Sequence, residues 1–180
     1  MTGTETLKQE QYNRSIYLKL AVLALILIIF DQLMKYAAVI KLKGNQPFVL
    51  IENVLELHYL ENQGAAFGML QNRQIFFSII TLIFIAASVY VIIKIPKRRY
   101  YLPFMITVCV LFSGAIGNFI DRLTKKYVVD FIYFSIIDFP VFNVADIYVT
   151  LSVIALALMI IFKYKDNDFD FLKISGISRK

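Results

Sequence analysis

The sequence predicts an all-α integral membrane protein with four transmembrane helices and a small extracytoplasmic β-sheet. Hydrophobic residues make up 59% of the 180 residues and the mean hydropathy is +0.67, whereas a soluble domain is about 45–50% apolar. Four apolar stretches reach the ~20 residues that cross a bilayer as a helix. After the first stretch, polar and apolar residues alternate, as in a strand with one wet face. The length fits one membrane-embedded domain over residues 1–180.

The predicted helices lie at residues 17–40, 75–93, 100–120 and 141–162. The first is apolar until Asp31 and Lys35 interrupt it, and their i, i+4 spacing suits an ion pair on one helical face. The second and third helices carry no charge. The fourth has Asp146 close to its start.

Basic residues predict the orientation of these helices. The short link at residues 94–99 carries four basic residues and no acid, and short basic loops remain in the cytoplasm. Four spans then place both termini in the cytoplasm and the other two connections outside. The net charge of +6 is concentrated at helix flanks, which favours contact with anionic membrane lipids over nucleic acid.

The first outer connection predicts a small sheet within residues 41–70. From residue 51 to 62, polar side chains alternate with apolar ones, which is typical of a strand. Residues 48–51 supply a partner strand, with a turn near Glu52 and Asn53. Small residues at 64–68 would let another backbone come close. We expect this sheet to lie on the outer membrane surface.

Two aspartates, Asp130 and Asp146, lie where long hydrophobic stretches meet their flanks. An ionisable group in or near a bilayer is expensive, so its presence indicates a function. Two neighbouring carboxyl groups can also share one proton, which is the basis of aspartic protease chemistry. Asp130 and Asp146 are therefore the candidate catalytic residues.

Further polar residues flank this pair. Asn118, Asp121 and Arg122 are spaced i, i+3 and i+4, which predicts one helical face at the outer end of the third helix. Asn143 and Asp146 are spaced i, i+3 at the start of the fourth helix, where the helix dipole favours a carboxylate. We expect these groups to converge on one pocket near the outer leaflet.

Such a pocket suits peptide hydrolysis. One carboxylate accepts a proton from water while the other carboxyl group donates one to the carbonyl oxygen. The sequence holds one histidine, His58, and one cysteine, Cys109, too few for a multi-His or thiolate metal site. We therefore expect no metal at this site.

Three alternatives remain open from the residues alone. A hydroxyl nucleophile could be activated by Lys35 in place of the two acids. Intramembrane acids also mark proton- or ion-coupled transporters, but those usually show internal repeats and acids near the bilayer midplane. A non-catalytic membrane scaffold is the third alternative, with Asp130 and Asp146 paired to Arg122 or Lys125.

Taken together, five segments resemble the bacterial lipoprotein signal peptidase family, also called signal peptidase II. They occur in the family's order and extend over all four predicted helices. The segments are Asp31-Gln32-Leu33-Met34-Lys35, Asn62-Gln63-Gly64-Ala65-Ala66-Phe67, Gly117-Asn118-Phe119-Ile120-Asp121-Arg122, Val128-Val129-Asp130-Phe131 and Phe142-Asn143-Val144-Ala145-Asp146.

The resemblance implies an aspartyl endopeptidase of the bacterial cell membrane that needs no cofactor. Its substrates would be diacylglyceryl-modified prolipoproteins, cut on the N-terminal side of the lipidated cysteine. Asp130 and Asp146 would form the catalytic dyad, and the sheet would be the family's β-cradle. We expect a monomer that is inhibited by globomycin. Substrate-binding and supporting roles would go to Asn62, Gly64, Asn118, Asp121, Arg122, Asn143, Ala145, Asp31 and Lys35.

The chain departs from the family pattern in three places. Ser152 stands where many members carry glycine, which affects helix packing and not the dyad. The stretch between Asp130 and Asp146 is slightly short, which affects the loop over the pocket. The tail at residues 166–180 matches no pattern of the family.

Overall fold

A computed structural model describes residues 3–64 and 74–173, so the predicted small-residue run at 65–68 lies outside the described residues. Within them, four helices are long and apolar enough to cross a membrane. These are α1 (Gly3–Leu42), α2 (Gln74–Lys94), α3 (Leu102–Lys125) and α4 (Val144–Phe162). The prediction of a four-helix membrane protein is confirmed.

Three helix ends differ from the prediction by three residues or more, each for a local reason. The polar residues before the first apolar stretch continue α1 as a helix, and its spanning part begins at Arg14. The third helix runs past residue 120 to Lys125 and ends where Lys126 takes a left-handed conformation with φ of 68°. The fourth helix begins at Val144, because Asn143 is its N-cap.

The sheet has three antiparallel strands in the order β1 (Phe48–Ile51), β2 (Leu55–Asn62) and β3 (Val128–Tyr133). The predicted hairpin between the first two is confirmed, and Asn53 turns it with φ of 57°. The third strand was not predicted, and it comes from the connection that carries Asp130. Because β2 is the central strand, most of its residues are half-buried and the expected wet face is absent from it.

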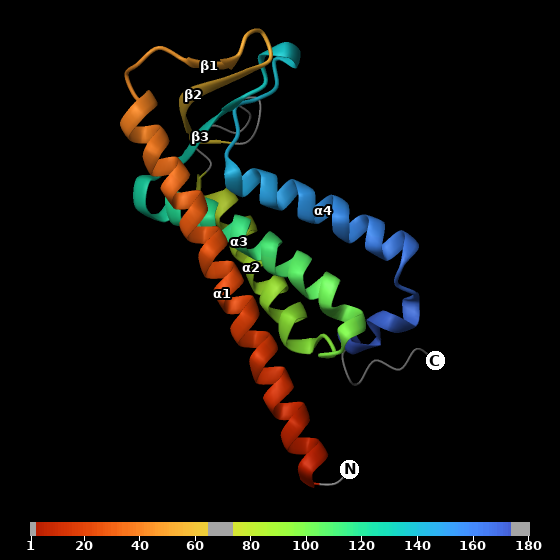
Figure 1. The fold of residues 1–180 in the computed structure, drawn as a ribbon. Helices are drawn as coiled ribbons and strands as arrows, with labels where there is room; N and C mark the ends of the chain where they lie inside the picture. Colours follow the sequence, from red (N-terminus) through yellow and green to blue (C-terminus); the bar gives the residue numbers. More distant parts are fainter. Residues whose placement is uncertain (1–2, 65–73, 174–180) are drawn as a thin grey trace.

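Helix α3 lies at the centre of the helices, between α1, α2 and α4 (Figure 1). In its most apolar segment, half of the residues are buried, whereas 6–22% of the residues are buried in the corresponding segments of the other three helices. Two glycines make this packing close. A Cβ at Gly114 would lie 2.6 Å from the carbonyl oxygen of Ala145, and one at Gly117 would lie 2.5 Å from Oδ2 of Asp31. Both positions therefore require glycine, and they bring α1 and α4 against α3.

The start of the C-terminal tail folds back on the helices as a 3₁₀ helix, η4 (Asp166–Leu172), close to the N-terminal end of α3 (Figure 1). The hydroxyl of Tyr101 donates to the carbonyl oxygen of Asp168 at 3.0 Å. The ring of Phe169 lies 5.9 Å from that of Phe104 and 6.1 Å from that of Tyr164. This tail segment therefore joins the end of α4 to the start of α3.

Phe169→Ala should lower the free energy of unfolding by about 1–3 kcal/mol, because its half-buried ring is lost from this aromatic cluster. The measurement is thermal unfolding of the detergent-purified protein. Asp170→Asn is the matched control, since Asp170 pairs only with the exposed Lys173 among the described residues and exposed pairs contribute little. Equal melting temperatures for the two variants would contradict a stabilising role of η4.

Candidate active site

Asp130 lies in β3, with 1% of its surface exposed. Asn62 donates from Nδ2 to its Oδ2 at 2.8 Å, and Asn143 donates from Nδ2 to its Oδ1 at 2.6 Å. The antiparallel register pairs Leu60 with Asp130 and Asn62 with Val128. Asn62 is thus a diagonal neighbour of Asp130 on the same face of the sheet. Both oxygens of this carboxyl group accept an amide hydrogen.

Asp146 is the third residue of α4 and forms a capping box with Asn143. Oδ1 of Asn143 accepts from the backbone N–H of Asp146 at 3.0 Å, and Oδ2 of Asp146 accepts from the backbone N–H of Asn143 at 3.1 Å. The other oxygen of Asp146 accepts from Nδ2 of Asn118 at 2.8 Å. The box satisfies two N–H groups that the helix leaves free, which explains why α4 begins here.

Asn143 joins the two aspartates, because it donates to Asp130 from its side chain and to Asp146 from its backbone. Backbone hydrogen bonds between β3 and Phe142 place Asn143, the next residue, beside the strand. The backbone N–H groups of Phe131 and Ile132 both donate to the carbonyl oxygen of Phe142, at 2.9 and 2.8 Å. The start of α4 is therefore fixed next to the strand that carries Asp130.

The two carboxyl groups interact electrostatically. Burial and the negative charge of Asp146 raise the pKa of Asp130 to about 7. The amide hydrogens of Asn62 and Asn143 act in the opposite direction, because they stabilise the charged form. The net effect favours the protonated form of Asp130.

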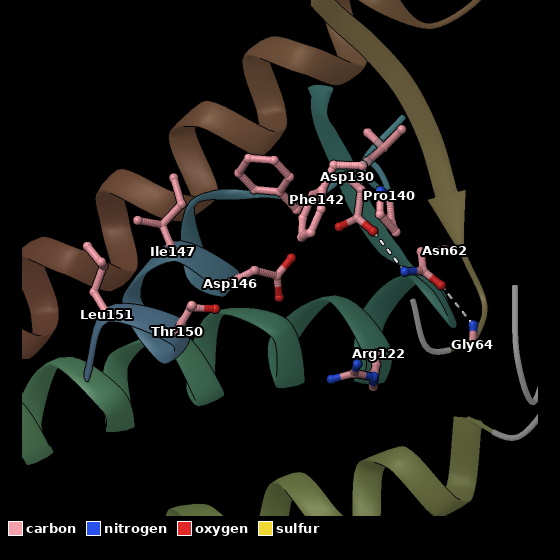
Figure 2. Close-up of a pocket in the computed structure, with 12 residues that line it drawn as sticks. Asn62, Gly64, Arg122, Asp130, Pro140, Phe142, Asp146, Ile147, Thr150 and Leu151 are labelled. Carbon is pink, nitrogen blue, oxygen red and sulfur yellow. Dashed lines mark hydrogen bonds between the residues drawn. The ribbon is translucent and has the colours of Figure 1, made fainter. Parts of the chain in front are cut away.

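Both aspartates open into one pocket of about 420 Å³. Figure 2 shows their carboxyl groups pointing into it from β3 and from α4, with Asn62 beside Asp130. Gly64 and Arg122 also line the pocket. The remaining lining is apolar except for one threonine, and consists of Phe139, Pro140, Val141, Phe142, Ile147, Thr150 and Leu151. A water molecule and an apolar ligand could both reach the acids here.

Arg122 lies on the pocket wall away from the two aspartates (Figure 2). Its guanidinium group donates to Oγ1 of Thr81 at 3.4 Å and lies 5.9 Å from the ring centre of Phe77. Within residues 3–64 and 74–173 it forms no ion pair with Asp130 or Asp146. The structure thus contradicts the alternative in which Arg122 pairs with these acids as a purely structural partner.

Behind the pocket, the side chains of Asp31, Lys35 and Asp121 form a fully buried cluster of charges, with the partly exposed Lys125 at its edge. Nζ of Lys35 lies 2.9 Å from Oδ2 of Asp31, as the i, i+4 spacing predicted, and 3.3 Å from Oδ2 of Asp121. It also donates to Oδ1 of Asn118 at 2.8 Å. Lys125 adds a second cation, 2.9 Å from Asp121. The prediction that Asp121 shares one face with Arg122 was wrong, because Asp121 contacts α1 and Arg122 contacts α2.

The two acids of this cluster hold the backbone beside the dyad. Oδ1 of Asp31 accepts from the N–H of Ala145 at 2.9 Å, directly before Asp146. Oδ2 of Asp121 accepts from the N–H of Val129 at 3.1 Å, directly before Asp130. Ala145 is fully buried behind the site, and its backbone N–H provides the hydrogen bond that fixes the start of α4 to Asp31.

The structure brings the predicted residues together in two groups. Asn62, Gly64, Arg122 and the two aspartates line the pocket, and Asn118 and Asn143 contact the aspartates from behind. Asp31, Lys35, Asp121 and Ala145 form the buried support. The sequence predicts an apolar groove for the lipid chains but not the residues that form it. Thr150 follows Asp146 by four residues, and Ile147, Thr150 and Leu151 are spaced i, i+3 and i+4, which places them along one side of α4.

Comparison with known proteins adds an independent observation. A sequence profile described as signal peptidase (SPase) II matches residues 23–162. A lipoprotein signal peptidase of Streptococcus thermophilus is 40% identical over 147 residues, which cover 82% of this chain and 94% of that protein. A lipoprotein signal peptidase of Streptococcus agalactiae is 39% identical over 137 residues, covering 76% and 88% of the two chains.

Solved structures show the same relationship. A bacterial membrane enzyme determined by the in meso method at 2.3 Å resolution superposes with a TM-score of 0.70 and 38% sequence identity, covering 82% of this chain and 93% of that chain. A second such structure, at 1.9 Å resolution, gives a TM-score of 0.68 and 36% identity, covering 82% and 94%.

Proposed function

The chain belongs to the signal peptidase II family and is a multi-pass membrane peptidase that cleaves lipoprotein signal peptides, and we propose that Asp130 and Asp146 carry the reaction. The observation that supports this assignment is their shared pocket, in which Asn143 donates hydrogen bonds to both acids. The family relationship does not favour the transporter alternative.

In the proposed reaction, Asp146 accepts a proton from water while the water oxygen attacks the scissile carbonyl carbon. Asp130 gives its proton to the carbonyl oxygen, so a neutral tetrahedral diol forms. The carbon–nitrogen bond then breaks. Asp146 returns its proton to the leaving nitrogen, and Asp130 takes one back from a diol hydroxyl. Both acids regain their starting states, and no cofactor takes part.

The surroundings of the two acids support this division of roles. Asp146 accepts a backbone hydrogen at the positive end of α4, which favours a carboxylate there. The burial of Asp130 raises its pKa to about 7, which favours its protonated form. One proton on the pair also avoids the repulsion between two adjacent charges.

The apolar wall suggests how the substrate binds. Diacylglyceryl chains would enter sideways from the bilayer and pack on this wall, where each buried CH₂ group contributes ~0.8 kcal/mol. Arg122 and Asn62 would bind polar groups of the peptide near the lipidated cysteine. The site would lie near the outer leaflet of the bacterial cell membrane, with both termini cytoplasmic. We further propose that the enzyme acts as a monomer and that globomycin inhibits it.

Asp130→Asn and Asp146→Asn should each reduce cleavage by about 10²- to 10⁴-fold or more, because each removes a proton-transfer group. The measurement is a gel-shift assay with purified protein and a diacylglyceryl-modified prolipoprotein. Asp138→Asn is the matched control: Asp138 lies in the same outer connection and accepts only from Tyr133 among the described side chains. Cleavage by either dyad variant at the wild-type rate would remove that aspartate from the reaction.

The pH profile of kcat/KM should have two limbs. Activity should be low in acid, where both carboxyl groups are protonated and neither can accept a proton from water. It should fall again as pH increases through about 7, because Asp130 then loses the proton that it must donate. The measurement is initial cleavage rate at low substrate concentration in buffers from pH 4 to 9, with folding monitored at each pH. A rate that stays level across the region around pH 7 would contradict the acid role of Asp130.

A further inference from the structure

Three asparagine side chains point their amide hydrogens at the dyad. Asn62 and Asn143 donate to Asp130, and Asn118 donates to Asp146. An amide group can also be turned over, which would present its oxygen to the carboxylate in place of its hydrogens. The orientation of each amide group therefore decides whether the aspartate next to it accepts a hydrogen bond or is repelled by the amide oxygen.

Each amide oxygen is occupied by a group that can only donate. The backbone N–H of Gly64 donates to the oxygen of Asn62 at 2.9 Å, and that of Asp146 donates to the oxygen of Asn143 at 3.0 Å. The oxygen of Asn118 accepts from Nζ of Lys35 at 2.8 Å and, at the longer distance of 3.2 Å, from Nδ2 of Asn143. Asn118 is thus the amide whose oxygen accepts from a charged side chain.

The ammonium group of Lys35 is suited to this task. It has three donor hydrogens and no acceptor, and three oxygens lie around it, from Asp31, Asp121 and Asn118. The side chain is fully buried, so water cannot replace these partners. A turned-over Asn118 would place its NH₂ group against the ammonium group and its oxygen against Asp146.

We propose that Lys35 is a positioning residue for peptide cleavage, because it fixes the Asn118 amide with its hydrogens toward Asp146. This inference rests on the proposed role of Asp146 as the base. Lys35 itself does not reach the substrate pocket, and its action runs through Asn118. Without the ammonium group, the Asn118 oxygen keeps the longer hydrogen bond from Asn143 but loses its charged donor. Asn118 then turns its oxygen toward Asp146 more readily, and the carboxylate form needed to accept a proton from water is disfavoured.

The experiment compares Lys35→Met with Lys125→Met in the full-length protein. Both lysines lie within reach of Asp121 and both take part in i, i+4 ion pairs. Lys125, however, contacts neither Asn118 nor the aspartates of the dyad. Lys35→Met should lower kcat by about 10- to 100-fold, as expected for loss of a hydrogen bond to a charged group, with KM within about twofold. Lys125→Met should keep kcat near the wild-type value.

A second variant separates positioning from folding, since Lys35→Met leaves Asp31 and Asp121 with less positive charge around them. Asp31→Asn combined with Lys35→Met keeps the net charge of the cluster unchanged, and the asparagine oxygen can still accept from Ala145. Its melting temperature is measured first, and its kcat should fall as in the single variant. A folded double variant with wild-type kcat would overturn the proposal.

The route through Asn118 is tested by a double-mutant cycle. In an Asn118→Ala background, Lys35→Met should lower kcat by less than about twofold, because the amide that it orients is already absent. The same 10- to 100-fold loss in that background would overturn the proposal and assign Lys35 a general structural role. Dyad variants run in the same series separate the two claims. Wild-type cleavage by Asp146→Asn would overturn the role of Asp146 as the base, whereas full kcat in folded Lys35→Met overturns only the positioning role.

Discussion

The ion pairs of one buried lysine are the constraint on which the rest of this structure depends. Removing a charge from water costs several kcal/mol unless partners surround it, and Lys35 meets this requirement with Asp31 from its own helix and Asp121 from α3. Lys125, whose side chain is 32% exposed at the edge of the cluster, brings the sum of the four charges to zero. The same two carboxylates hold the backbone directly before each aspartate of the dyad. The two carboxylates that neutralise the buried lysine are therefore also the groups that position the backbone of the site.

Close backbone approach makes this arrangement possible. Any side chain at Gly117 would meet Asp31, and any side chain at Gly114 would meet the carbonyl oxygen of Ala145. Small residues let membrane helices pack closely where lipid provides no hydrophobic driving force between them. Because α3 can approach both neighbours, the carboxylate of Asp31 reaches the first turn of α4. Asp146 then falls opposite β3, although helix and strand belong to different layers of the fold.

Sequence reasoning found the parts of this protein that depend on hydropathy and spacing along the chain. The helices were predicted because lipid requires long apolar segments, and the dyad because Asp130 and Asp146 interrupt such segments. Strand β3 was missed because its first four residues are buried on both faces, so it reads as a short apolar run without alternation. The separate directions of Asp121 and Arg122 could not be predicted either. Spacings of i, i+3 and i+4 group residues along one helix but do not say which neighbouring helix each side chain meets.

The position of the pocket between sheet and helix explains how two opposing effects on Asp130 can be balanced. The apolar wall and the nearby carboxyl group disfavour its charge, and by themselves would keep it protonated over a wide pH range. The amides of Asn62 and Asn143 stabilise the charge and limit this effect, so the pKa stays at about 7. A proton-transfer group works best with a pKa near the operating pH. A fully lipid-exposed dyad would lack the donors, and a fully hydrated one would lack the burial. The boundary between the helices and the sheet supplies both.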